Sequence, residues 1–81
     1  MYTVTWHRYP HGIEGEEMDC HWREFDDIEK AIRFLEGRAN LIKSINWAGG
    51  YIEDENGKEL YAIYDSGESE DLRSGTELKG R

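Results

Sequence analysis

Four side chains near the amino terminus are of the types that most often bind zinc: His7, His11, Cys20 and His21. A structural zinc site needs four such ligands around one metal ion. Successive side chains of a strand point to opposite faces, so strands over residues 2–9 and 18–25 place Cys20 on the side of a covering helix. His7 and His21 then lie on the other side, facing one another across a hairpin. We therefore expect no metal or other cofactor, and we interpret Cys20 as an unreactive core thiol.

The remaining catalytic patterns are weak. A Cys-His or Ser-His-Asp arrangement requires the nucleophile and the base within hydrogen-bonding reach in a cleft that excludes water. A single sheet with one helix leaves little room for such a cleft. Residues 48–50, AGG, lack the lysine and the following helix of a phosphate-binding loop. We expect a protein without enzymatic activity, and a small hydrolase or metal-dependent enzyme is the less favoured alternative.

Acidic side chains dominate the charge: 18 Asp and Glu residues against 10 Lys and Arg residues give a net charge of -8. Such a charge repels phosphate backbones and anionic lipids, so we expect no direct binding to nucleic acid or to a membrane. The carboxylates gather in residues 14–19, 24–29 and 53–59. They form either solvated loops and a helix start, or an acidic face that matches a basic partner.

Compartment and size follow from simple features of the chain. A single cysteine excludes an intramolecular disulfide framework, and the start MYTVTWHRYP lacks the basic and apolar regions of a secretory signal. No apolar segment approaches the roughly 20 residues that span a bilayer. These features predict a small cytoplasmic protein.

Apolar periodicity predicts two hairpins on either side of one helix. Residues 2–9 and 18–25 alternate between apolar and polar side chains, as the strands of an antiparallel hairpin do. The helix is expected over residues 27–36, with Asp26 and Glu29 at the spacing of a capping box and Gly37 at its end. The alternative is a helix that continues through RANLIKS, residues 38–44, with a later start of the next strand, and Gly37 argues against it.

The second hairpin is indicated by Asn56-Gly57, which predicts a two-residue turn. Trp47 and Ile52 have opposite parity, and a bulge at Gly49 and Gly50 would bring both to one face. The turn predicts three facing pairs: Glu55 with Lys58, Ile52 with Tyr61, and Tyr51 with Ala62.

These elements predict an α+β domain over residues 1–65, with a four-stranded, mostly antiparallel sheet in the order β-β-α-β-β packed on one helix. Residues 66–81 hold two leucines and show no periodicity, which predicts a flexible polar tail.

One helix cannot cover both faces of this sheet. Four strands span about 19 Å, whereas a helix with its side chains is about 10–12 Å wide. The expected core is Val4, Trp6, Met18, Cys20, Trp22, Ile28, Ile32, Leu35, Ile45, Trp47, Ile52, Tyr61 and Ile63. The uncovered face is expected to carry Thr3, Thr5, His7, Tyr9, His21, Arg23, Tyr51, Leu60 and Tyr64.

The uncovered tyrosines and the acidic groups together predict a site for a protein partner. Tyrosine offers an apolar body and a polar tip, and carboxylates attract a basic surface. The predicted partner-binding residues are Glu14, Glu16, Glu17, Asp19, Tyr51, Glu53, Asp54, Glu55, Leu60 and Tyr64.

Three features of the chain occur together: its small size, its acidic charge, and the pattern YTVTW … FDDIEKAIRFLE … GGYIEDENGKELY between residues 2 and 61. In these features the chain resembles small acidic proteins of bacteriophages and mobile elements, among them anti-CRISPR and anti-restriction inhibitors. The resemblance implies a non-enzymatic protein that blocks a nucleic-acid-handling complex, its carboxylates occupying a site meant for phosphates. The alternative is a homodimeric structural or regulatory domain that buries the tyrosine-rich face against a second copy.

Overall fold

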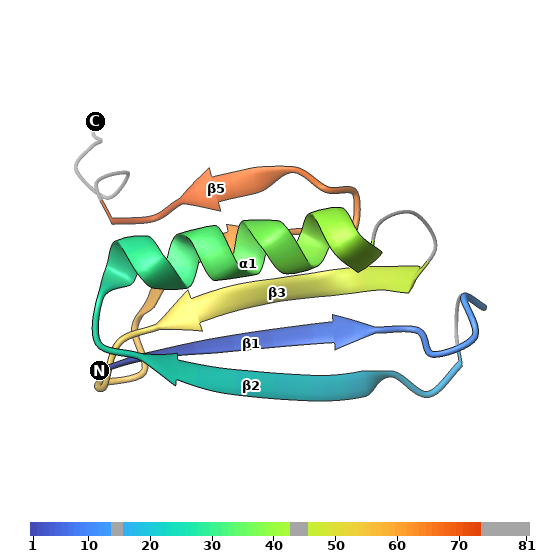
Figure 1. Cartoon of the computed structure of the whole chain (residues 1–81), viewed down its shortest axis with the longest axis horizontal. Helices are drawn as coiled ribbons and strands as arrows, with labels where there is room; N and C mark the ends of the chain where they lie inside the picture. Colours follow the sequence, from blue (N-terminus) through green and yellow to red (C-terminus); the bar gives the residue numbers. More distant parts are fainter. Residues whose placement is uncertain (14–15, 43–45, 74–81) are drawn as a thin grey trace.

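The fold consists of one helix on one face of an antiparallel sheet (Figure 1). The structure is a computed structural model that describes residues 1–13, 16–42 and 46–73. Its elements are β1 (Tyr2–Arg8), β2 (Asp19–Phe25), α1 (Ile28–Ile42), β3 (Trp47–Glu53), β4 (Glu59–Ile63) and β5 (Ser69–Asp71). The strands lie in the order β2-β1-β3-β4-β5. The α+β class is confirmed, but the described residues form five strands rather than four.

The hairpin between β3 and β4 has the predicted pairing but a different turn. Ile52 faces Tyr61 and Tyr51 faces Ala62, as predicted. The prediction of a two-residue turn with Glu55 opposite Lys58 is wrong. The loop instead comprises residues 55–57, because Asp54 N donates to Lys58 O at 3.0 Å. The Asp54 carboxylate accepts hydrogen bonds from the backbone N–H groups of Asn56 and Lys58, which stabilises the wider loop. The extra residue is absorbed by a register shift beside Leu60.

Strand β5 comes from the segment that was predicted to be a flexible tail. Tyr64 N donates to Glu68 O at 2.8 Å, and Gly67 N donates to Tyr64 O at 2.9 Å. This loop has three residues, like the loop between β3 and β4, and each ends in a glycine with positive φ: 83° at Gly57 and 95° at Gly67. The prediction of a tail is therefore wrong for Ser69–Asp71, while residues 74–81 lie outside the described residues.

Helix α1 is longer than predicted, since it runs through Gly37 to Ile42. Ala39, beyond the glycine, packs against the core, and this packing outweighs the roughly 1 kcal/mol that glycine costs a helix. Its amino-terminal cap is Asp27 rather than Asp26, because the Asp27 carboxylate accepts the Glu29 N–H at 2.8 Å. Within the described ranges, no helix has the length and apolar character needed to cross a membrane.

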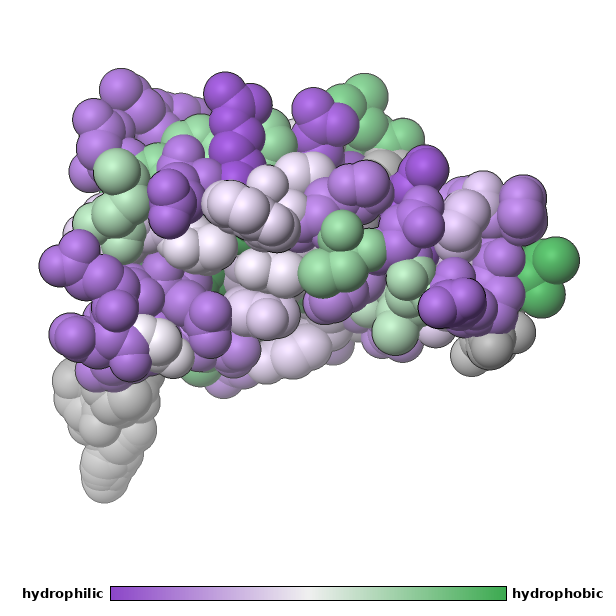
Figure 2. All heavy atoms as spheres, turned by 90° about the horizontal axis from the view of Figure 1, so that it is seen from below, coloured by the Kyte–Doolittle hydropathy of each residue, from purple (hydrophilic) through white to green (hydrophobic). Residues whose placement is uncertain are grey.

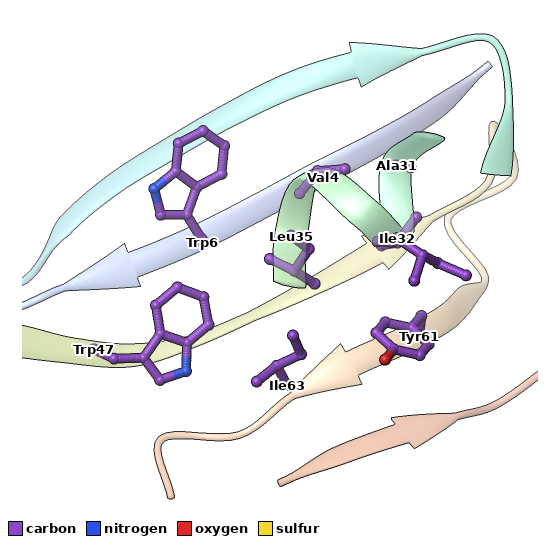
Figure 3. Close-up of a cluster of buried hydrophobic side chains, with 9 residues drawn as sticks. Val4, Trp6, Ala31, Ile32, Leu35, Trp47, Tyr61 and Ile63 are labelled. Atoms are coloured by element: carbon purple, nitrogen blue, oxygen red, sulfur yellow. The ribbon is translucent and has the colours of Figure 1, made fainter. Parts of the chain in front are cut away.

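The core lies between α1 and the sheet, where the side chains of both layers point toward one another (Figure 3). Eight predicted core residues are buried: Val4, Trp6, Ile32, Leu35, Trp47, Ile52, Tyr61 and Ile63. Ala31 and Ala62 are buried as well, Ile28 packs partly against the cluster, and the predicted core position at residue 45 lies outside the described residues. Leu35 approaches β3 so closely that a Cβ on Gly50 would lie 2.8 Å from its Cδ1.

A bulge in β3 explains how Trp47 and Ile52 share the core in spite of their opposite parity. Trp47 pairs with Arg8 and Gly49 pairs with His7, so Ala48 is the extra residue. The predicted bulge is present, one residue before its expected place. Gly49 follows it with a φ of 114°, a conformation that favours glycine.

Strand β2 presents the opposite face to the one predicted. His21 pairs with Trp6 and Arg23 pairs with Val4, and directly opposite residues share a face, so both lie on the helix side. The prediction that Met18, Cys20 and Trp22 belong to the core is wrong, because all three are exposed.

Phe25, at the end of β2, gives the physical reason for this facing. Its ring packs against the core with its centroid 5.1 Å from that of Phe34 on α1. Once Phe25 faces the helix, alternation along β2 places Arg23 and His21 on the same side.

Candidate functional site

The face of the sheet away from α1, which we call the open face, can be assigned row by row from the strand pairing. α1 contacts β1, β2, β3 and β4 on the other side, and no described element packs on the open face. One row crosses all five strands: Trp22, Thr5, Tyr51, Ala62 and Glu70. The rows beside it are Glu24, Thr3 and Glu53, and Cys20, His7 and Gly49.

Three aromatic side chains stand on this face. Trp22 is 66% exposed and Tyr64 is 45% exposed, whereas Tyr51 is half-buried. Tyr51 and Tyr64 line a shallow hollow of about 300 Å³, together with His7, whose ring centroid is 6.5 Å from that of Tyr51. Exposed aromatic residues around such a hollow are typical of interfaces.

Tyr64 is held in place by β5, since its hydroxyl donates a hydrogen bond to the carboxylate of Glu70. This bond to the neutral phenol, with the negative charge of the acceptor, raises the pKa of Tyr64. The strand that sequence reasoning missed thus orders one of the predicted partner-binding residues.

The charges on the open face are all of one sign. Glu24, Glu53 and Glu70 lie in the rows described above, and Glu59 pairs directly with Glu53. Like charges directly opposite one another destabilise a sheet. Among the described strand positions of this face there is no Lys or Arg. The open face is therefore acidic and aromatic, and the Glu53 and Glu59 pair would be relieved by a cation.

The two acidic groups predicted from the sequence are not brought together. Glu16 to Asp19 precede or begin β2 at one end of the sheet, and Glu53 to Glu55 lead into the turn after β3 at the other end (Figure 1). The seven-residue strand β1 separates these ends by about 20 Å. The predicted site residue at position 14 lies outside the described residues.

Several of these carboxylates are already engaged in local contacts. Glu16 accepts hydrogen bonds from the backbone N–H groups of Ile13 and His11, which lower the pKa of its carboxyl. Asp19 lies 3.4 Å from Arg8, and Glu55 lies 3.2 Å from the terminal amine. Glu17 is exposed, Asp54 closes the β3–β4 loop, and Leu60 is half-buried at the register shift in β4.

The residues that sequence reasoning missed on this face are Trp22, Glu24, Glu59 and Glu70. Trp22 was assigned to the core by apolar alternation alone. Glu70 was assigned to the tail, although DSG at residues 65–67 resembles ENG at residues 55–57 and could have indicated a further hairpin.

The candidate zinc ligands are arranged differently from the prediction. His7 lies directly opposite Cys20 on the open face, and His21 lies on the helix side, so the expectation that His7 and His21 face one another is wrong. Within residues 1–13, 16–42 and 46–73, no three side chains of His, Cys, Asp or Glu are grouped to hold a metal ion.

The fold and this face define a small α+β domain with one acidic, aromatic and uncovered sheet surface. In comparisons with known proteins, the chain matches no family model, no curated protein and no solved structure.

Proposed function

We propose that this chain is a non-enzymatic protein-binding inhibitor whose open face occupies a basic surface of a nucleic-acid-handling complex. The observation that carries the proposal is the composition of that face, where the exposed Trp22 and Tyr64 stand among four carboxylates. At the described strand positions of the face there is no Lys or Arg. The acidic groups at the two ends of the sheet lie apart, so the proposal does not rest on them.

The division of labour on this face follows from general interface energetics. Buried aromatic anchors carry most of the binding free energy at protein interfaces, which assigns that role to Trp22, Tyr51 and Tyr64. Carboxylates mainly set the association rate and the choice of partner. A cationic side chain from the partner would also remove the repulsion between Glu53 and Glu59, which face one another in the free protein.

A homodimer is the second candidate, and the exposure of Trp22 on the edge strand β2 favours it. A twofold interface places the same patch of both copies face to face. On the open face this would bring Glu24, Glu53 and Glu70 of both copies into one interface and add like-charge repulsion. A basic partner carries no such penalty, so it is the favoured occupant.

The proposal is tested by capture of partners from native cytosol on the immobilised full chain, followed by affinity measurements on the captured nucleic-acid-binding enzyme. Trp22→Ala and the double variant Glu24→Gln/Glu53→Gln should each weaken binding about tenfold or more. The matched control is Glu17→Gln/Glu55→Gln, which also removes two charges but lies off the face, and it should change affinity less than about twofold.

Two results would contradict the proposal. Affinity that is the same in about 50 mM and 500 mM salt would remove the electrostatic component. Equal affinities of the open-face variants and the matched control would show that the open face is not the binding surface. Light scattering on the free chain decides the second candidate, since a monomer at high concentration excludes the homodimer.

A further inference from the structure

A second polar site lies on the helix side of β2, where α1 packs against the edge of the sheet. There the guanidinium of Arg23 lies 5.3 Å and 5.2 Å from the ring centroids of Phe25 and Phe34. The guanidinium of Arg38 lies 5.0 Å from the Phe34 centroid and 5.9 Å from the Trp6 centroid. Cations over aromatic rings therefore cover this flank of the core. Seen from the side of β2, hydrophilic residues surround paler, less polar ones (Figure 2).

The end of this flank forms a pocket of about 210 Å³, lined by Trp6, Arg8, His21 and Arg38. The His21 ring is stacked on Trp6 with its centroid 5.5 Å away, so the imidazole is fixed beside the two arginines. The strand pairing of His21 with Trp6 places this pocket on the helix side of the sheet. It is therefore separate from the open face.

The donors around the pocket are incompletely used. Arg8 reaches Asp19 through Nη2 at 3.4 Å, while its Nε is buried and has no hydrogen-bond partner among the described residues. Because this Nε atom is shielded from solvent, a ligand would be bound through the Nη groups of Arg8 rather than through Nε. In the described part of the chain, no carboxylate forms an ion pair with Arg38. A guanidinium stacked on a ring keeps its N–H groups free in its own plane.

We propose that this pocket binds an oxyanion, the phosphate or carboxylate group of a small ligand. Two guanidinium groups offer charge-assisted hydrogen bonds of the geometry that planar carboxylates and phosphates accept. The volume of about 210 Å³ is below that of typical pockets for whole drug-sized molecules, so it suits one anionic group with a few attached atoms. The site depends on neither the open face nor the proposed function.

The net charge of -8 does not oppose this site at physiological salt. Charges separated by more than the Debye length, about 8 Å at this ionic strength, are largely screened. An anion in the pocket is governed by its immediate neighbours: Arg8, Arg38 and His21 line it, while the Asp19 carboxylate, 3.4 Å from Arg8 Nη2, offsets part of the positive charge. The repulsion from the distant carboxylates mainly slows association.

The test is a nuclear magnetic resonance titration of the full chain, labelled with ¹⁵N, at constant ionic strength. The probes are inorganic phosphate and, separately, glutarate. We expect saturable shifts in the backbone amides of residues 6, 8, 21 and 38 and in the Trp6 indole N–H. Arg38→Gln should weaken binding at least about tenfold, whereas Arg33→Gln, which removes the same charge from an exposed position of α1, should weaken it less than about twofold.

The two probes distinguish the sources of the anionic group. Saturation by phosphate alone identifies a phosphorylated ligand, and saturation by glutarate alone identifies a carboxylate ligand; both results support the site. Lack of saturation by either anion up to about 50 mM, or equal weakening by Arg38→Gln and Arg33→Gln, overturns it. If Arg38→Gln fails to fold, Arg38→Lys replaces it in the test, because it keeps the charge but not the planar guanidinium. A clear loss of affinity in Arg38→Lys supports the assignment, and an unchanged affinity overturns it.

Discussion

Replacement of Trp22 and of Trp6 by alanine, in separate variants, tests the facing of β2 on which both proposed surfaces depend. The two tryptophans occupy adjacent strands and undergo the same chemical change. The structure places Trp6 in the core at 8% exposure and Trp22 on the open face at 66% exposure. The sequence pattern, in contrast, assigned both to the core, so the two interpretations predict different results.

The expected magnitudes follow from these exposures. Truncation of a core tryptophan to alanine costs about 3–5 kcal/mol, and Trp6→Ala should show this loss. Trp22 is 66% exposed, so roughly a third of its surface contacts the protein and Trp22→Ala should cost about 1–2 kcal/mol. A domain of 81 residues has a total unfolding free energy of about 4–12 kcal/mol. Trp22→Ala should therefore remain folded, while Trp6→Ala should be near the limit of stability.

The assay is urea unfolding followed by far-ultraviolet circular dichroism, which does not depend on tryptophan emission. A loss for Trp22→Ala as large as that for Trp6→Ala would refute the facing of β2. Cys20 provides an independent control, because it shares the open face with Trp22 and is exposed. It should react with a maleimide in the native protein at the rate of an exposed thiol, whereas protection until denaturant is added would contradict the structure.

Two further predictions concern stability. Gly37→Ala should raise the unfolding free energy by about 0.5–1 kcal/mol in a thermal melt, because Gly37 lies inside α1 and its added Cβ would meet nothing within 4 Å. The matched Gly50→Ala should lower it by about 1–3 kcal/mol, since that Cβ would lie 2.8 Å from Leu35 Cδ1 and 2.9 Å from Thr5 O; equal effects of the two variants would contradict the packing of α1 on β3. Hydrogen bonds from Arg73 lower the pKa of Asp71 from 3.8 to about 2, so the pair stabilises the folded state above pH 4 or so and this contribution is lost as pH falls toward 2. Titration of the Asp71 carboxyl by nuclear magnetic resonance should give this low value and a higher one in Arg73→Gln, and a native value near 4 would contradict it.

Local patterns predicted most of the elements and the pairing within the second hairpin. The positions of β1, β3 and β4 and the facing of Ile52 with Tyr61 follow from alternation and from the turn residues. The errors arose where tertiary packing outweighs local preference. Gly37 does not end α1, because the following turn still packs against the core through Ala39.

The candidate site was less predictable than the fold. Tyr51 and Tyr64 lie on the uncovered face, as predicted, but Trp22 was assigned to the core because alternation identifies two faces without saying which one meets the helix. For β2 the choice is made by Phe25 and by Arg23, whose guanidinium covers the Phe25 and Phe34 rings. A polar residue that protects core aromatics at a sheet edge has no distinctive signal in a single sequence.

The facing of β2 also decides how charge is distributed between the two sides of the sheet. Alternation sends His21 and Arg23 to the helix side and Trp22 and Glu24 to the open face. A shift of the β2 pairing by one residue would exchange the two faces of this strand. It would place the Glu24 carboxylate against the aromatic rings on the helix side and bring Arg23 beside the acids of the open face. Both proposed surfaces therefore rest on one register, although they attract ligands of opposite charge. A change that shifts β2 should weaken both kinds of binding together, whereas Trp22→Ala and Arg38→Gln should each weaken one about tenfold or more and leave the other intact.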